Sequence, residues 1–352
     1  MKFGWRGALG IVLSILLLGW TLHDVAWGDV WRELRASNLP LFLAAATCAT
    51  LIFPLRAIRW RVILDPVAPR LPVGMLWRAT AIGMMVNNVV PARAGEIARA
   101  YALTRETPKV GFAAAFASIA VDRVFDAIVL LLLLCVAMLD PRFPGGALIG
   151  GRPVSQWVGS WGTLAVLGMF AAFYVFVFFP QRIVTLFEWF ARRVAPSIEA
   201  RGREMILTFA AGLGVLRHPG RFAAVFGWTV AHWLVNGLAF WLGFKAVGIT
   251  APYTAALFLQ GLIALGVAVP SSPGFFGVFE AIAKTGLSDV YGVPATLAVS
   301  WAIGYHILAF IPITAIGAAY FVRMGLHFRD VGEAEEEAGP APAGAPPPQH
   351  AA

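Results

Sequence analysis

Two short segments of this chain place prolines, glycines and polar residues in the middle of apolar sequence. Each segment begins with a Val-Pro pair, and a glycine lies four residues after the proline: Pro91 with Gly95, and Pro270 with Gly274. Proline removes a backbone donor and clashes with the preceding helical turn, so each segment predicts a break in a helix. The helix that begins after each break turns free N–H groups and the positive end of its dipole towards the break, which favours a bound anion such as phosphate.

Polar side chains in both turns suit the same chemistry. Arg93 adds a full positive charge and a guanidinium fork that matches phosphate oxygens. In the second turn Ser272 can cap the next helix, with Pro273 as its first residue, and Ser271 and Gly274 belong to the same turn. These residues are therefore candidates for substrate binding. The alternative is that the prolines and glycines only allow tight packing of a hairpin.

Three charged residues, Asp122, Arg123 and Asp126, interrupt one long apolar run. A charge at the centre of a membrane costs on the order of 3 kcal/mol by insertion scales, so such residues line a cavity or pair with one another. The two aspartates are four residues apart and share one face of a helix. We expect them mainly to pair with arginines, and Asp122 or Asp126 with Arg93 or Arg99 is the leading candidate pair.

The charged residues Glu96, Arg99 and Glu280 lie close to the two turns. We expect them to contribute to substrate binding, with Glu96 or Glu280 meeting any amine on the headgroup. His232 and His306 have no local ligand partner, so hydrogen bonds between helices are a better expectation than a metal site. The chain has no Walker A motif, nucleophile elbow, HExxH motif or Rossmann fingerprint, so we expect neither an enzyme nor a cofactor.

The composition indicates that a membrane surrounds these residues. Of the 352 residues 59% are hydrophobic and 13% are charged, with a mean hydropathy of +0.75; a soluble domain carries about twice that share of charge. The net charge of +8 and the pI near 10 would suit nucleic acid, but the basic residues cluster in short segments between apolar runs. Membrane topology produces this pattern. The expected partners are membrane lipids, and nucleic acid is not among them.

Six apolar stretches are long enough to cross a bilayer as helices, which takes about 20 residues. Two further apolar regions, 73–107 and 252–288, contain the two turns and are interpreted as helical hairpins that are either re-entrant or cross twice. The predicted fold is an all-α polytopic membrane protein, with six transmembrane helices plus two broken or re-entrant hairpins. The six spans are residues 7–22, 39–57, 111–139, 160–180, 222–247 and 293–322.

Lysine and arginine set the expected orientation. Segments assigned to the cytoplasmic side, among them 55–80 with Arg56 and Arg59, hold 20 of the 27 basic residues. This distribution predicts a bacterial inner (plasma) membrane protein with both termini in the cytoplasm. The Arg-rich segment 181–221 is either an amphipathic helix on the anionic cytoplasmic leaflet or an ordinary loop. Residues 1–329 form the membrane domain, with its first helix retained rather than cleaved. The acidic, proline-rich tail 330–352 is expected to be disordered.

In this topology the two hairpins enter the membrane from opposite sides, and a span precedes and follows each of them. This is the outline of an inverted repeat, in which broken helices mark a substrate site near the membrane midplane. Under this hypothesis the turns at Pro91 and Pro270 face one another across a shared cavity. The match between the turns is short, so chance similarity is the competing explanation.

Three motifs carry a family resemblance: NVVPARAGEIAR at 88–99, DRVFD at 122–126 and PSSPGFFGVFE at 270–280. They resemble the lysylphosphatidylglycerol synthase transmembrane (flippase-like) family, and the resemblance covers about residues 5–325. In bifunctional members a separate soluble domain carries out the synthesis, so synthase activity is not expected here. The resemblance implies a lipid flippase, with roles for Arg93, Glu96, Arg99, Asp122, Arg123 and Glu280.

We therefore expect translocation of an anionic or aminoacylated phospholipid, or of another lipid-linked headgroup, across the inner membrane. The alternative is a non-transporting membrane partner or anchor of a glycosyltransferase, or of an enzyme that modifies an envelope lipid such as a hopanoid. A polar cavity at the turns favours translocation, and buried turns without one favour the anchor. The sequence does not select the lipid, the direction, the energy source or the oligomeric state.

Overall fold

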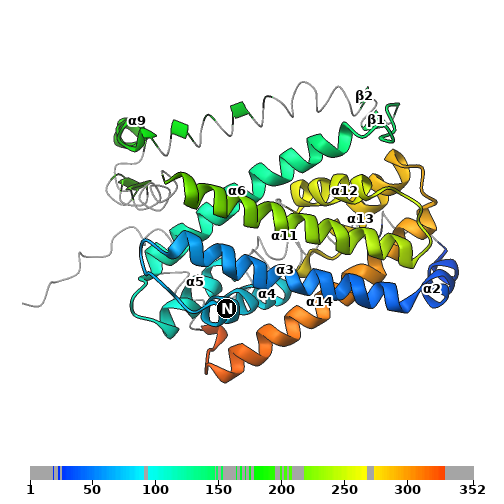
Figure 1. Cartoon of the computed structure of the whole chain (residues 1–352), viewed down its shortest axis with the longest axis horizontal. Helices are drawn as coiled ribbons and strands as arrows, with labels where there is room; N and C mark the ends of the chain where they lie inside the picture. The colour runs from blue at the N-terminus through cyan, green and yellow to red at the C-terminus, as the bar shows by residue number, and fades with distance from the viewer. Residues whose placement is uncertain are drawn as a thin grey trace, which may run out of the picture.

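Within its described residues the protein is all-helical apart from a two-residue antiparallel pairing of β1 (Leu148–Ile149) with β2 (Arg152–Pro153). Long helices run side by side along the long axis of the molecule, as Figure 1 shows. The expectation of an all-α chain is confirmed. Besides short pieces before and between them, the computed structural model describes five long ranges of the chain: 26–90, 94–146, 178–194, 218–267 and 273–329.

The first half of the chain forms a long helix, a broken hairpin and a second long helix. The first long helix begins at Leu39 because the Asn38 side chain accepts a hydrogen bond from the Leu41 N–H at 3.1 Å. Val90 ends the first arm of the hairpin with an extended backbone, as expected for a residue before proline. The elements are α2 (Trp27–Ala36), α3 (Leu39–Leu64), α4 (Val73–Val89), α5 (Gly95–Glu106) and α6 (Phe112–Met138).

The second half repeats this order of elements. The sequence predicts Pro273 as the first residue of the helix after the break, and this is wrong. Pro273 begins a separate 3-10 turn, and the helix starts only at Val278, because positive φ values at Gly274 (64°) and Gly277 (89°) interrupt a right-handed helix. The elements are α11 (Pro219–Ala246), α12 (Tyr253–Gly266), η4 (Pro273–Phe275), α13 (Val278–Lys284), the π-helical turn η5 (Thr285–Val290) and α14 (Ala295–Arg323).

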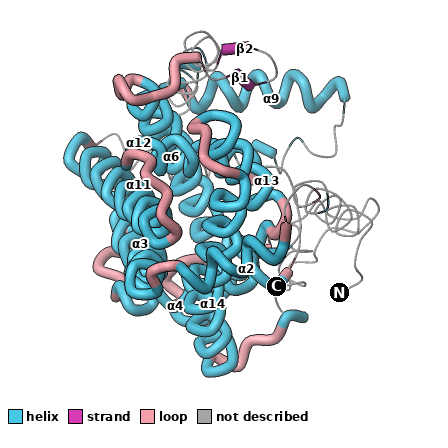
Figure 2. The backbone as a smooth tube through the Cα atoms, turned by 90° about the vertical axis from the view of Figure 1, so that its right-hand side faces the viewer, coloured by secondary structure: helices cyan, strands magenta, loops and turns pink. Residues whose placement is uncertain are grey.

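The two halves pack against each other along α3 and α11, which run antiparallel. At one end the Asn38 N–H donates to the Ala246 carbonyl at 2.8 Å, and at the other Arg221 lies 3.6 Å from Asp65. In two further contacts between the halves, the long helix that follows one hairpin packs on the first arm of the other hairpin: α6 packs on α12, and α14 packs on α4. Within each half, the long helix that follows the hairpin packs on its second arm, α6 on α5 and α14 on α13. Figure 2 views this bundle along its helices.

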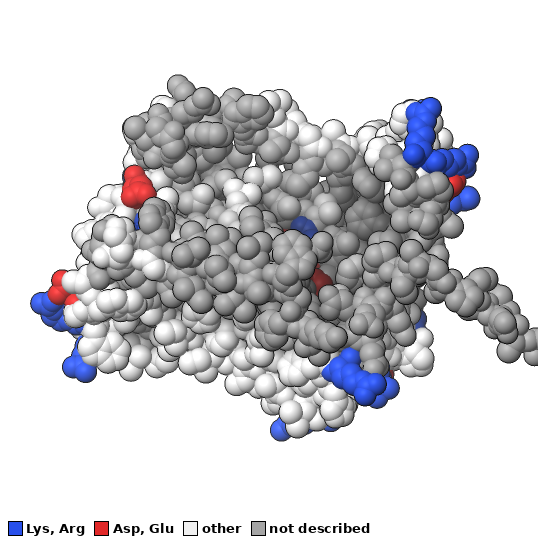
Figure 3. Space-filling view, turned by 180° about the vertical axis from the view of Figure 1, so that it is seen from behind, with Lys and Arg blue, Asp and Glu red and all other residues white. Residues whose placement is uncertain are grey.

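Within the described residues, three helices are long and apolar enough to cross a membrane: α3, α11 and α14. With 27 residues α6 has a similar length, but it carries Asp122, Arg123 and Asp126 near its middle. On the face in Figure 3, charged side chains lie mainly towards the margins, and one blue and one red patch are visible in the middle; most of the described surface between them is uncharged.

Four of the six predicted spans coincide with long helices: 39–57 with α3, 111–139 with α6, 222–247 with α11 and 293–322 with α14. The predicted spans 7–22 and 160–180 fall largely outside the described residues, as does the tail 330–352. Both predicted hairpins are present as pairs of helices, α4 with α5 and α12 with α13. The apolar runs therefore located these elements to within a few residues, except that α3 continues beyond its predicted end.

A separate helix, α9 (Pro180–Val194), lies at the edge of the bundle in Figure 1 and exposes large apolar side chains. Leu186, Trp189 and Phe190 are 67%, 54% and 56% exposed, on a helix whose last turn carries two arginines. Exposed apolar residues beside arginines are typical of a helix that lies on a membrane surface. For this part of segment 181–221, the amphipathic helix is favoured over an ordinary loop.

Candidate functional site

Seven charged side chains meet inside the bundle, where α3, α5 and α6 come together. α3 supplies two arginines, α5 a glutamate and an arginine, and α6 two aspartates and an arginine. This charge cluster consists of Arg56, Arg59, Glu96, Arg99, Asp122, Arg123 and Asp126. The side chains of Arg59 and Asp122 are fully buried, so the cluster lies in the interior of the bundle.

Asp122 is the centre of the cluster. Its Oδ1 lies 2.6 Å from Arg59 Nη2, and its Oδ2 accepts a hydrogen bond from Arg99 Nη1 at 3.0 Å. Arg56 Nη2 is further away, at 3.6 Å from Oδ2. The Arg99 guanidinium also stacks over the ring of Trp60, 3.9 Å from its centroid. The sequence expects a pair between an aspartate and Arg99, and the structure contains it.

Asp126, one turn further along α6, binds the same arginine from the other side. Its Oδ1 accepts hydrogen bonds from Arg59 Nη1 at 2.6 Å and from Trp233 Nε1 at 3.0 Å. Arg59 Nη1 also donates to Thr229 Oγ1 at 3.0 Å, and His232 Nε2 lies 3.8 Å from Asp126. Arg59 therefore joins α3, α6 and α11, and links the two halves of the protein.

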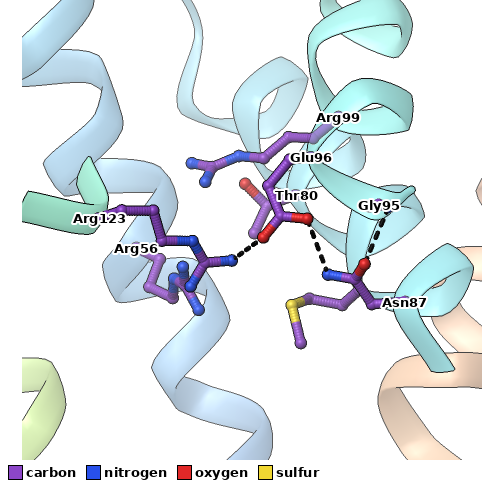
Figure 4. A pocket seen from close by; sticks show the side chains of 9 residues that line it. Arg56, Thr80, Asn87, Gly95, Glu96, Arg99 and Arg123 are labelled. Atoms are coloured by element: carbon purple, nitrogen blue, oxygen red, sulfur yellow. Dashed lines mark hydrogen bonds and ion pairs between the residues drawn. The ribbon is translucent and has the colours of Figure 1, made fainter. Parts of the chain in front are cut away.

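Glu96 pairs with Arg123 and not with its neighbour Arg99. Arg123 Nη2 lies 2.5 Å from Glu96 Oε1, as Figure 4 shows. Asn87 of α4 connects the two arms of the hairpin, because its Oδ1 accepts the Gly95 N–H at 2.9 Å and its Nδ2 makes a long contact of 3.5 Å with Glu96 Oε2. The N–H group of Gly95 at the start of α5 is therefore bound to a side chain of the protein and is not left for an anion.

The two arms of the first hairpin touch at glycines. A Cβ atom on Gly83 or on Gly95 would clash with the carbonyl oxygen of the other, and one on Gly95 would also clash with Asn87. Glycine allows this close approach. The packing explanation therefore accounts for Gly95, whereas Gly274 is explained by its positive φ.

A narrow pocket opens between the charge cluster and the first hairpin (Figure 4). The space between its lining residues is about 240 Å³, which includes open solvent at its mouth, so the pocket does not enclose an entire lipid. Its charged and polar lining residues are Arg56, Thr80, Asn87, Glu96, Arg99 and Arg123.

Positive charge exceeds negative charge in the cluster, which has four arginines and three carboxylates among the described residues. The side chains of Arg56 and Arg99 are 7% and 5% exposed. Within the described part of the chain, Nε of both arginines and Nη2 of Arg99 have no hydrogen-bond partner. A buried donor without a partner costs about 1–3 kcal/mol, and more when it is charged. An anion in the pocket would supply both the missing charge and the missing acceptors.

The second turn is built around Glu280. Its Oε2 accepts the Gly277 N–H at 2.6 Å, and its Oε1 lies 2.7 Å from Nδ1 of His306. The other ring nitrogen of His306 lies 2.8 Å from the carbonyl oxygen of Gly274. The anion at the start of α13 is therefore the protein's own carboxylate. Hydrogen bonding between helices, the expectation for the histidines, is confirmed for His306.

Three predicted site residues, Arg93, Ser271 and Ser272, lie outside the described residues, so their part in the site stays a prediction. The described lining of the pocket comes from α3 to α6 and includes no residue of the second hairpin. Both turns nevertheless contact α14. Near the first turn, Asn88 Nδ2 donates to Thr314 Oγ1 at 2.7 Å, eight residues beyond His306, which contacts the second turn. The shared cavity remains a hypothesis.

The sequence prediction counted Arg56 and Arg59 among the basic residues of a cytoplasmic segment, 55–80, and the structure corrects their place in the fold. α3 continues to Leu64 and carries both arginines into the bundle, where the aspartates of α6 balance their charge. The sequence contained a signal for this pairing. The Arg-x-x-Arg spacing places two arginines on one helix face, and the Asp-x-x-x-Asp spacing on α6 places two aspartates on one face, so the two faces can pair. Asn87 and His306 had no comparable local signal.

The sequence matches the family described as "Lysylphosphatidylglycerol synthase TM region" over residues 7–317. The chain belongs to this family. The resemblance inferred from the three motifs is thereby confirmed. Together with the long apolar helices, membership of the lysylphosphatidylglycerol synthase transmembrane-region family makes the chain a multi-pass membrane protein.

Relatives are found in archaea. Two proteins of Methanothermobacter thermautotrophicus, both named "UPF0104 membrane protein", are 28% and 25% identical over 330 and 334 residues, covering 88% of this chain and 90% of each relative. A "Glycosyltransferase AglD" of Haloferax volcanii is 34% identical over 137 residues, which is 39% of this chain and 22% of that protein. The similarity to the two membrane proteins thus covers most of the chain, whereas the similarity to the glycosyltransferase covers a part of it.

Proposed function

We propose that this protein moves an anionic or aminoacylated phospholipid, or another lipid-linked headgroup, from one leaflet of the membrane to the other. The observation that carries the proposal is the pocket beside the first hairpin, where buried arginines outnumber carboxylates inside a membrane bundle. An excess charge in a low-dielectric interior is costly, so the pocket favours a negatively charged group. Lipid phosphates are the anions that a membrane itself supplies.

An inverted repeat would give such a site access to both leaflets. If α3 corresponds to α11, the two equivalent helices run antiparallel, as an inverted repeat requires. If α4 likewise corresponds to α12 and α6 to α14, the contact of α6 with α12 is equivalent to the contact of α14 with α4. This regularity supports six spans and two broken hairpins related by an axis in the membrane plane. Rocking of one half against the other would then move the headgroup while the acyl tails stay in lipid.

Each part of the pocket has a proposed role. Arg56 and Arg99 bind phosphate oxygens through their free N–H groups, and Arg93 at the adjoining turn completes the site. Glu96 binds an amine on the headgroup and releases Arg123, its ion-pair partner. The aspartates of α6 are not expected to touch the lipid, because they hold the arginines in place.

We place the protein in the inner membrane of a bacterium with both termini in the cytoplasm, on the distribution of its basic residues. Reporter fusions at Asp330 and near Arg152 should report opposite sides of the membrane. The same side for both fusions would contradict this topology. We propose a binding role and not an enzymatic one, because the described lining of the pocket holds charged groups that bind and no serine, cysteine or histidine.

The second candidate function is a non-transporting membrane partner of an enzyme that transfers sugars or modifies envelope lipids. The partial similarity to a protein named as a glycosyltransferase favours it. In that case the pocket would hold a lipid-linked substrate for the enzyme without moving it between leaflets. A purified protein that binds anionic lipid but leaves leaflet exchange unchanged would support this function over translocation.

Leaflet exchange of headgroup-labelled lipids in vesicles tests the proposal. Vesicles with the purified protein should exchange an anionic lipid faster than protein-free vesicles. Arg56→Gln removes the charge and should slow exchange about tenfold, the equivalent of ~1.4 kcal/mol. Arg32→Gln is the matched control, because Arg32 is 71% exposed on α2 and pairs with Asp29; it should behave as the wild type. Equal exchange in protein-containing and protein-free vesicles would contradict the proposal.

A further inference from the structure

His306 of α14 bridges two acceptors at the second turn. Its Nε2 lies 2.8 Å from the Gly274 carbonyl oxygen, and its Nδ1 lies 2.7 Å from Glu280 Oε1. A backbone carbonyl only accepts hydrogen bonds, so Nε2 must carry a hydrogen. A further proton is then needed between Nδ1 and the carboxylate, because two lone pairs repel at this distance. The pair therefore holds one proton more than a neutral imidazole beside an ionised carboxylate.

We propose that Glu280 and His306 form the binding site of a coupling proton. The pair shares this proton, either as an imidazolium with a carboxylate or as a neutral imidazole with a carboxylic acid. The inference rests on the proposed lipid translocation and extends it, because the proton is then the ion that gates or drives the movement. The proton enters and leaves as such, so the step needs no other reactant.

The surroundings of the pair suit a proton that is bound and released. The Glu280 side chain is 2% exposed and that of His306 is 11% exposed, so the imidazole is the more open end of the pair. The rings of Phe276 and Phe279 lie against the imidazole, with centroids 4.3 and 4.5 Å from its own. Aromatic faces stabilise a cation, so they favour the protonated imidazole without adding a second fixed charge.

Other ionisable groups lie on the elements that pack around the pair. Lys284 lies one turn beyond Glu280 on α13. On α2, which packs against the first turns of α14, Asp29 and Arg32 pair with each other. Other ionisable groups on elements that pack on α13 or α14 include Asp289 on η5, Tyr305 on α14, Cys48 on α3, Tyr253 on α12 and Arg78 on α4. Tyr253 donates to a backbone carbonyl and Arg78 binds Glu106, so neither is oriented to take this proton.

Loss of the proton changes what holds the second turn. Among its described residues the turn contains three with positive φ, Gly274 (64°), Phe275 (62°) and Gly277 (89°), and this conformation is strained for phenylalanine. His306 holds one end of the turn through the Gly274 carbonyl, and Glu280 holds the other through the Gly277 N–H. Without the shared proton, the single hydrogen left on the ring serves the carbonyl or the carboxylate, but not both. One contact must then break, and the turn is released.

The protonation state can be measured directly on the purified protein. Nitrogen-15 NMR of the six histidines, with H306Q to identify the signal of His306, reports which ring nitrogens carry hydrogen. We expect hydrogen on both nitrogens, or on Nε2 together with a carboxylic-acid infrared band that E280Q removes, and loss of this proton as the pH rises. A singly protonated ring beside an ionised Glu280 at every pH would overturn the proposal.

Lipid exchange at different pH values tests the coupling. Exchange by the wild type should change severalfold with pH, and H306R should remove this dependence, because arginine keeps its charge. H218Q is the control, since His218 is exposed ahead of α11, and it should keep the wild-type profile. A pH dependence that H306R retains would overturn the coupling. A wild type that exchanges no lipid, with a proton on His306 that leaves on titration, would contradict the lipid function and support the proton site.

Discussion

The two broken hairpins place a glutamate at the same point of the fold but give it different partners. Glu96 is the second residue of α5 and Glu280 is the third residue of α13. Their partners, Arg123 and His306, each lie eleven residues after the first residue of the long helix that follows. An arginine keeps its charge at any physiological pH, whereas the charge of a histidine side chain depends on pH. Corresponding positions therefore hold an arginine–glutamate pair in the first half and a histidine–glutamate pair in the second.

The surroundings differ in the same sense. Around Glu96 lie further arginines, which leave an excess of positive charge. Around Glu280 lie aromatic rings, which leave the histidine as its only described ion-pair partner. The difference teaches that one scaffold can surround the same glutamate with fixed positive charge in one half and with aromatic rings and a histidine in the other, in line with the proposed anion and proton sites. The variants below test this division.

The largest effect is expected from Asp122→Asn. It leaves Arg59 and Arg99 without their shared carboxylate in the interior, and loss of one partner of a buried ion pair costs about 3–5 kcal/mol. The unfolding temperature in detergent should fall sharply, while Asp29→Asn on the exposed surface of α2 should leave it unchanged. A stably folded Asp122→Asn protein that had lost lipid exchange would instead make Asp122 a substrate-binding residue.

Arg93→Lys should have the next largest effect, on exchange and not on stability. Lysine keeps the charge but loses the bidentate fork, so lipid exchange should fall about tenfold, ~1.4 kcal/mol, while the protein still inserts and accumulates. Arg56→Lys should act in the same direction, because Arg56 lines the same pocket. Unchanged exchange in both variants would exclude phosphate recognition by these arginines.

Arg123→His would replace the arginine–glutamate pair of the first half with a histidine–glutamate pair like that of the second half. A histidine is charged only towards acid pH, so the pair with Glu96 should persist at about pH 5 and weaken by pH 8. Because Arg123 is 41% exposed, solvent screens the pair and the cost should be about 1 kcal/mol. Thermal unfolding across this range measures the effect, and Arg123→Lys, which stays charged, should show no such dependence. A flat profile for both would mean that the pair does not stabilise the fold.

The smallest effect is expected where α6 meets α12. Hydrogen bonds from Arg142 and Thr254 hold the pKa of Asp140 well below its usual range. A carboxyl with a depressed pKa in the folded state stabilises the fold above its unfolded pKa, near 3.9, and this contribution is lost as the pH falls through the folded value. Asp140→Asn should slightly lower the unfolding temperature at pH 7, and the difference from the wild type should shrink below about pH 4. A difference that stayed constant with pH would assign it to packing instead.

Much of the helical framework was predictable, because its causes act over a few residues. Apolar runs located α3, α6, α11 and α14, and the two Val-Pro pairs located the breaks between the arms of the hairpins. The same rules fail at two places. A span of standard length ends before Arg59, although α3 continues, and a proline at 273 indicates a helix start that positive φ at Gly274 postpones.

The sequence by itself determined that this chain is helical, membrane-embedded and broken twice, since hydropathy and proline geometry are local properties. It also showed that charges such as Asp122 and Asp126 must find partners, because an isolated charge is costly in lipid. Only the tertiary structure decided which partners they find. Trp233 binds Asp126 from 107 residues away, and His306 reaches Glu280 across 26 residues. Such pairs depend on how helices distant in sequence pack and turn their faces, which no local pattern specifies.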